Sequence, residues 1–229
     1  MKLKTIHLAA MVISASAGIS QAAVTFSGIA NNTGFTVDNT SVLTIVNADL
    51  SYNTGENNAV PGGPNYWNVL DDGIFGSPGK TGSTVIAGDA GPNGLLWKFT
   101  AGASTIGSIS MYSGWTDNGR LEQHYSVYTT TDVSVTGSST WTLLATVDNG
   151  AGGPTSFATG SDTSLKTTIY DNASSTLASG ITGLRFNFSG GQQNGGVGYK
   201  ELDVQVIPEP SAALLGGLGM LALLRRRRA

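Results

Sequence analysis

The chain contains no cysteine, which excludes a disulfide framework. It has two histidines, and only His124 lies outside the first 22 residues, which excludes a histidine-rich metal site. Neither a Gly-x-Ser-x-Gly nor a His-Glu-x-x-His motif occurs. A fold without disulfides must be stabilised by its hydrophobic core, and the roughly 185 residues between the two ends are enough to form one.

Charged residues are also scarce, at 12% of the chain. Half of the twelve basic residues lie near the ends, namely Lys2, Lys4 and Arg225 to Arg228. The chain between them, counted as far as Glu209, keeps six basic residues against fifteen acidic ones, a formal charge of −9. This charge argues against nucleic acid and anionic membrane surfaces as partners of the body, and it favours metal cations.

Residues 1–22 have the features of a secretory signal peptide. Lys2 and Lys4 give a positive start, Leu8 to Ile13 form an apolar stretch, and Ser20-Gln21-Ala22 places small residues at a cleavage position. We therefore predict cleavage by signal peptidase after Ala22 and export of the remaining chain. The alternative is a buried first helix, but no capping signal or polar face accompanies the apolar run.

Residues 207–229 form a second segment that is distinct in composition. Pro208-Glu209-Pro210 precedes an apolar run of fourteen residues from Ser211 to Leu224, and four arginines follow, Arg225, Arg226, Arg227 and Arg228. Such a run is short for a bilayer span, which takes about 17–25 residues, but terminal arginines extend its reach by snorkelling. The arginines would remain cytoplasmic and the preceding body outside. The alternative is a globular C-terminal helix, which would not normally end in a cluster of arginines.

This arrangement resembles the PEP-CTERM sorting signal of exosortase substrates. The resemblance rests on Pro208-Glu209-Pro210, the membrane helix and the arginine cluster, in that order at the C-terminus. It implies processing by an exosortase near Pro208, Glu209 and Pro210 and transient anchoring in the inner membrane through the C-terminal helix. The expected destination is the cell surface or the extracellular space, with exopolysaccharide as a candidate partner.

The body, residues 23–206, is predicted to be all-β, an antiparallel β-sandwich in one domain. It contains most of the 32 glycines and shows period-2 alternation with one apolar face in each of its clearest segments. In one of these, Leu184, Phe186 and Phe188 are expected to face the core, with Arg185 and Asn187 outward. The strands expected are Val24–Ile29, Val42–Val46, Leu95–Thr100, Thr105–Met111, His124–Thr130, Trp141–Val147, Thr163–Ile169, Leu184–Phe188 and Leu202–Val206.

Two features of the connections are notable. Asp117-Asn118-Gly119 and Asp148-Asn149-Gly150 are predicted to be tight turns, because Asn-Gly pairs tolerate positive φ angles. The stretch from Asn53 to Lys80, rich in Gly, Pro and Asn, is expected to be a surface loop.

The second half resembles galactose-binding-like jelly rolls of the discoidin type, over roughly residues 65 to 206. The residues that carry this resemblance are His124 to Thr130, Trp141 to Leu144, Gly183 to Phe186 and the closing strand Tyr199 to Val204. The family implies a calcium ion between an early Asp-Gly loop and a glutamate of the last strand. The matching positions are Asp71, Asp72 and Glu201, and oxygen ligands of this kind suit calcium. Asp71-Asp72-Gly73 is otherwise an ordinary turn, and Glu201 otherwise a solvated strand residue.

The sequence context of the four tryptophans predicts two different environments. Trp67 and Trp115 lie in loop-like segments and are candidate ligand-binding residues that would stack on sugar rings, with packed loop anchors as the alternative. Trp97 and Trp141 lie within expected strands and are predicted to be core residues.

The leading hypothesis is therefore a non-catalytic, exported surface or matrix protein. The alternatives are a carbohydrate-binding module and a polysaccharide-degrading enzyme. An enzyme would need paired carboxylates, for which Asp117 with Glu122 and Glu201 with Asp203 are available. Because residues two apart in a strand share a face, Glu201 and Asp203 are expected on the solvated outer surface.

Overall fold

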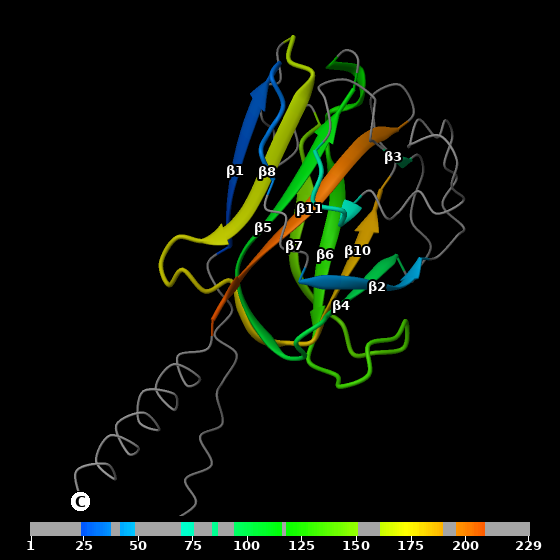
Figure 1. Ribbon diagram of the computed structural model, residues 1–229, viewed down its shortest axis with the longest axis vertical. Helices are drawn as coiled ribbons and strands as arrows, with labels where there is room; N and C mark the ends of the chain where they lie inside the picture. Colours follow the sequence, from blue (N-terminus) through cyan, green and yellow to red (C-terminus); the bar gives the residue numbers. More distant parts are fainter. Residues whose placement is uncertain are drawn as a thin grey trace, which may run out of the picture.

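The computed structural model describes residues 24–37, 42–48, 70–75, 84–86, 94–115, 118–150, 161–189 and 196–208 (Figure 1). In these residues the chain forms strands and almost no helix, apart from the short 3-10 helix η2 (Asn118–Arg120). The strands are β1 (Val24–Asn31), β2 (Leu43–Ala48), β3 (Thr84–Ile86), β4 (Leu95–Phe99), β5 (Ser104–Gly114), β6 (His124–Thr130), β7 (Thr142–Asp148), β8 (Ser164–Asp171), β9 (Ala178–Ile181), β10 (Gly183–Phe188) and β11 (Val197–Ile207).

The strands form two antiparallel sheets. Sheet A has the order β1-β8-β5-β11-β3, and β9 pairs with the end of β5. Sheet B has the order β2-β4-β10-β6-β7. Neighbours in each sheet are mostly not consecutive in sequence, because the chain passes repeatedly from one sheet to the other (Figure 1). The prediction of an all-β, antiparallel fold is confirmed.

One hydrophobic core receives side chains from both sheets. Leu184, Phe186 and Phe188 of β10 are all buried, as the period-2 pattern predicted, and Trp97 of β4 contacts Phe186 with ring centroids 5.3 Å apart. From sheet A, residues such as Ile109 contribute to the same core. The prediction of Trp97 as a core residue is confirmed.

Buried hydrogen bonds also connect the two sheets. The hydroxyl group of Tyr199 in β11 accepts from the backbone N–H of His124 at 2.9 Å and donates to the carbonyl oxygen of the same residue at 3.2 Å. The side-chain amide of Asn149 donates to the Thr167 hydroxyl at 2.9 Å. Since all these groups are buried, each bond satisfies polar atoms that water cannot reach.

The expected strands are all present, with ends that differ by a few residues. The sequence reasoning missed β3 and β9, which have three and four residues and carry too little alternation to be recognised. The Asn149-Gly150 turn prediction was wrong in its physical basis, because neither residue has a positive φ. Asn149 instead pairs its backbone with Gln123 and lies buried between the sheets.

Residues 1–22 and Glu209 to Ala229 lie outside the described residues, so the signal-peptide and sorting-signal predictions remain predictions. Pro208 is described, and it is exposed immediately after the end of β11. A search for helices long and apolar enough to cross a membrane finds none in the described part of the chain.

Candidate functional site

The candidate site forms around an irregularity in β11. Tyr199 pairs with Ser113 and Glu201 pairs with Tyr112, so Lys200 is an extra residue opposite β5. Such a β-bulge changes the side of the sheet to which the following residues point. As a result Tyr199 and Leu202 both contribute to the core, although they are three positions apart. Glu201 therefore lies on the side of sheet A that faces away from the core.

The segment 70–75 covers Glu201. Leu70 belongs to the shared core, whereas Phe75 contacts Tyr112 with ring centroids 6.1 Å apart. Between them the backbone turns at Gly73, whose φ of 73° favours glycine. The segment thus connects the core to the outer side of sheet A, and it lies against β11 in Figure 1.

This wrapping brings Asp72 and Glu201 together. The backbone N–H of Ile74 donates to Asp72 Oδ1 at 2.8 Å and to Glu201 Oε2 at 3.2 Å. The backbone of Gly73 also favours the ionised form of Glu201 and so opposes the increase of its pKa. Glu201 is only 2% exposed, so the expectation that it lies on a solvated outer surface was wrong. The reason is that the loop folds back onto the strand, which strand periodicity alone does not reveal.

The electrostatics of the pair are unusual. Burial, reinforced by the neighbouring charge of Asp72, raises the pKa of Glu201 to about 9. Burial likewise raises the pKa of Asp72, while the N–H of Ile74 opposes that increase. Ionisation of the buried Glu201 beside the carboxylate of the exposed Asp72 is therefore unfavourable, and a proton or a cation relieves the repulsion.

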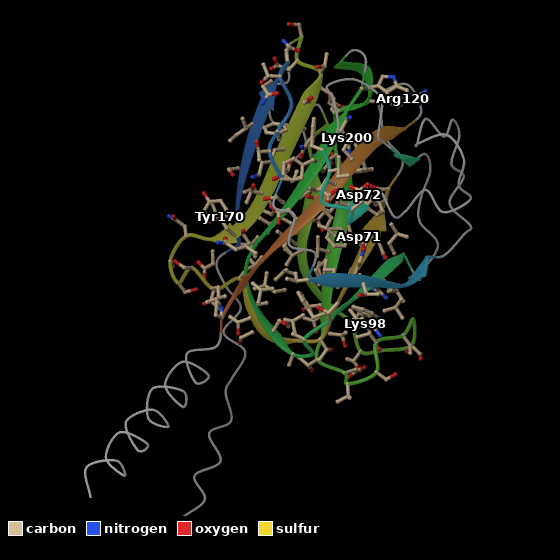
Figure 2. All side chains as sticks on the ribbon, viewed as in Figure 1. Asp71, Asp72, Lys98, Arg120, Tyr170 and Lys200 are labelled. Carbon is tan, nitrogen blue, oxygen red and sulfur yellow. The ribbon has the colours of Figure 1, made fainter. Side chains whose placement is uncertain are left out.

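The side chain of Asp71 does not join those of Asp72 and Glu201, the other two predicted calcium ligands. Burial raises its pKa to about 6, and the indole N–H of Trp97 opposes the increase, although its geometry falls short of a hydrogen bond. The structure thus brings Asp72 and Glu201 together through Ile74, whereas Asp71, labelled beside Asp72 in Figure 2, interacts with Trp97. No group of three or more His, Asp or Glu side chains is arranged for a metal ion within the described ranges.

Lys200, the bulge residue, is fully buried. Its ammonium group lies 4.8 Å from the centroid of the Phe75 ring, and burial lowers its pKa to about 8. The side chain passes over Gly114, where an added Cβ would overlap the Lys200 Cε. Lys200 therefore belongs to the same covered region as Glu201, above Asp72 in Figure 2.

Trp115 is a packed residue. Its ring is 8% exposed, it packs with Leu121 and Leu165, and the Arg120 guanidinium lies 4.5 Å above it. Of the two roles that the sequence left open for Trp115, the structure fits the packed loop anchor. Trp67 lies outside the described residues.

Trp141, in contrast, is not a core residue, and that prediction was wrong. It precedes β7 on the outer side of sheet B, half-buried, and the Arg185 guanidinium lies 5.1 Å from its ring centroid. Sequence reasoning missed this grouping. The available signal was the alternation in Leu184–Phe188, which already placed Arg185 outward.

The carboxylate pairs considered for an enzyme are not assembled as open sites in the described part. Asp117 lies outside the described residues, and Glu201 is covered. One histidine–carboxylate pair exists, in which His124 Nδ1 lies 2.9 Å from Asp148 Oδ1. The His124 Nε2 is buried without a hydrogen-bond partner, so no described nucleophile extends this pair into a triad.

Comparison with protein-family models gives no match, and comparison with curated proteins finds no relative. Function therefore has to be argued from these residues.

Proposed function

We propose that this chain is an exported, non-catalytic surface protein that associates with extracellular polysaccharide and whose body is stabilised by calcium. The body would be a jelly-roll sandwich of the galactose-binding-like kind. The observation that carries the proposal is the pair formed by buried Glu201 and exposed Asp72, whose carboxyl groups both accept the backbone N–H of Ile74 beside β11.

A structural role suits this pair better than catalysis. A general acid or nucleophile must reach its substrate, whereas Glu201 is covered by the segment 70–75. A carboxylate that is buried against a loop is well placed to fix that loop through a shared cation.

The donor chemistry of the pair fits calcium. Asp72 and Glu201 supply carboxylate oxygens, and calcium completes its six to eight ligands with backbone carbonyl groups and water. Each carboxylate uses one oxygen to accept the Ile74 N–H, which leaves further lone pairs available. When bound, calcium would supply the positive charge that this carboxyl pair lacks. Asp71 is a less suitable ligand, because its carboxyl group faces Trp97.

The two ends of the chain support export and sorting. Lys2, Lys4 and the apolar stretch that follows have signal-peptide character, and the arginine cluster Arg225 to Arg228 ends the tail. Signal peptidase and an exosortase are the partners that these segments imply. Pro208, the first residue of the Pro-Glu-Pro sequence, is exposed immediately after β11, as the proposed processing would require.

Deletion of Pro208 to Ala229 tests the sorting proposal. The truncation must keep Ile207, because this residue pairs with Thr105 in sheet A. A second variant replaces the four arginines, Arg225 to Arg228, with glutamine and leaves the rest intact. We expect both variants to lose surface localisation. The arginine variant should also keep its unprocessed tail and so be heavier than the mature wild-type chain by mass spectrometry. Unchanged localisation of both variants together with an unchanged mature mass of the arginine variant would contradict the proposal.

A carbohydrate-binding module is the second candidate function. It is favoured by Tyr128 and Trp141, which lie half-buried on the outer side of sheet B and offer aromatic surface of the kind that sugars stack on. A glycan array probed with the full chain tests it, and binding to no glycan would leave the matrix role alone.

A further inference from the structure

The outer side of sheet B carries an arginine held between two aromatic rings. The Arg185 guanidinium lies 4.3 Å from the ring centroid of Tyr128 and 5.1 Å from that of Trp141. Arg185 and Tyr128 are direct neighbours in the register of β10 and β6, and Trp141 leads into β7, the next strand. Three strands therefore fix the position of one cation.

This cation has no carboxylate partner among the described residues. Burial lowers the pKa of Arg185, and Tyr128 only partly offsets that effect. The Nε of Arg185 and the Nε1 of Trp141 are both buried without a hydrogen-bond partner. Desolvating a charge without a counter-ion is unfavourable, so an anion that binds here would recover stabilisation that the free protein lacks.

The surrounding face has the same sign of charge. Lys98 of β4 is exposed and pairs in register with Gly183, two positions before Arg185 (Figure 2). Standard sheet spacings place the Cα atoms of the two cations about 8 Å apart. The only carboxylate on the five strands of sheet B is Asp148, at the end of β7, where it pairs with His124. This cationic face contrasts with the strongly acidic body.

Apolar surface accompanies the two cations. Leu143, the register partner of Tyr128 in β7, is 46% exposed. At one end of the face Val135 packs against Gly183, where an added Cβ would lie 2.8 Å from the Val135 methyl groups. The result is a sheet face with two cations, two half-buried aromatic rings and an exposed leucine.

We propose that this face binds the carboxylate-bearing sugar units of an acidic polysaccharide, with Arg185 as the anchor. A planar guanidinium donates two parallel hydrogen bonds to a carboxylate, and the contacts of Arg185 with Tyr128 and Trp141 fix it before the ligand arrives. Lys98 would attract a second carboxylate of the same polymer, and the rings and Leu143 would contact sugar C–H groups. This inference rests on the proposed association with polysaccharide and names the class of polymer and the surface.

The test measures binding of the purified full chain to polygalacturonate and to the same polymer after its carboxyl groups are reduced to alcohols. Chelator is present throughout, so that calcium bridging does not contribute. The variants are Arg185→Gln and Arg185→Lys. The matched control is Lys166→Gln, which also removes one positive charge. The Lys166 ammonium group lies 5.1 Å from the centroid of the Tyr112 ring, on sheet A.

We expect the chain to bind the acidic polymer and not the reduced one, with an affinity that falls as salt is added. Arg185→Gln should weaken binding at least tenfold, and Arg185→Lys nearly as much, because lysine lacks the planar fork. Lys166→Gln should change the affinity less than twofold. Circular dichroism and thermal unfolding verify that each variant is folded.

A second measurement does not depend on the arginine variants. Binding should change the fluorescence of Trp141. The contribution of this residue is obtained by comparing the fluorescence of the wild-type chain with that of Trp141→Phe. Equal binding of the acidic and reduced polymers, or equal losses in the Arg185 and Lys166 variants, would overturn the assignment and leave polysaccharide association intact. Absence of binding to any acidic polymer would also overturn it, while the localisation of the tail variants tests the proposed function separately.

Discussion

Replacement of Glu201 by glutamine should make the protein less sensitive to pH and insensitive to calcium. The variant keeps the size of the side chain and its ability to accept the Ile74 N–H, but it removes the ionisable group beside Asp72. It therefore separates the electrostatic role of the carboxyl group from its packing.

The direction of the pH effect follows from the raised pKa. Folded Glu201 has a pKa of about 9, against an ordinary value of 4.5, so the native state retains a proton that the unfolded chain has lost. Stability in the absence of a cation must therefore decrease as pH rises above 4.5, and the decrease ends near pH 9. Asp72 and Asp71, whose pKa values are also raised, act in the same direction.

The magnitude can be estimated at pH 7. The folded chain keeps the Glu201 proton, whereas the unfolded chain releases it above pH 4.5. The free energy of unfolding therefore falls by about 1.4 kcal/mol for each pH unit above 4.5, or by roughly 3 kcal/mol at pH 7. In a domain of this size, each kcal/mol lost from the free energy of unfolding lowers the melting temperature by about 2–4 °C. Calcium at about a hundred times its dissociation constant would add about 2.7 kcal/mol.

The assay is thermal unfolding of the full chain between pH 5 and pH 8, with chelator or with calcium. We expect the wild-type chain to lose stability with rising pH in chelator and to regain it with calcium, most strongly at the higher pH. Glu201→Gln should show a shallower pH profile and no calcium shift. Asp162→Asn, which makes the same change in net charge on a side chain outside the cluster, should behave as the wild type.

Parallel pH profiles for the wild-type chain and Glu201→Gln would refute the electrostatic reasoning. Unchanged melting temperatures with calcium at every pH would refute the calcium proposal alone, because the pH effect does not require a metal ion.

Three further predictions concern stability and are measured by chemical denaturation. Gly94→Ala should destabilise by about 1–3 kcal/mol, since φ is +53° and the new Cβ would overlap the Phe186 carbonyl and the Asn187 side chain; a loss below half a kcal/mol would contradict the close approach. Trp97→Ala should cost about 3–5 kcal/mol and the half-buried Trp141→Ala clearly less, so equal losses would show that Trp141 is packed as a core residue. Asn149→Ala should cost about 1–3 kcal/mol because it leaves the buried Thr167 hydroxyl without its partner, and a double-mutant cycle with Thr167→Val should show strong coupling; additive losses would argue against that bond.

Sequence alone predicted the fold class and most strands because period-2 alternation identifies a half-buried strand directly. In β10 the pattern gave the facing of every side chain from Leu184 to Phe188. It failed where a strand is too short to alternate, as in β3, and where residues next to a strand decide the environment. Trp141 is such a case, because it lies one residue before β7.

The candidate site was predictable only in part. Family resemblance selected Asp72 and Glu201, and the structure brings these two together through the turn at Gly73. It also predicted Asp71, whose carboxyl group faces Trp97 instead. The burial of Glu201 depends on a contact between positions 127 residues apart, and no local pattern encodes such a contact. The position of Arg185 beside Tyr128 and Trp141 likewise depends on which strands become neighbours.

The position of β11 has a consequence for the order in which the molecule assembles. This last strand lies between β5 and β3 and supplies Val197, Tyr199, Leu202 and Val204 to the core. Synthesis delivers it after every other strand of the described residues, so sheet A remains incomplete until Ile207 has emerged. Completion of the fold is thereby delayed until this strand is made, a delay that would suit the export proposed above.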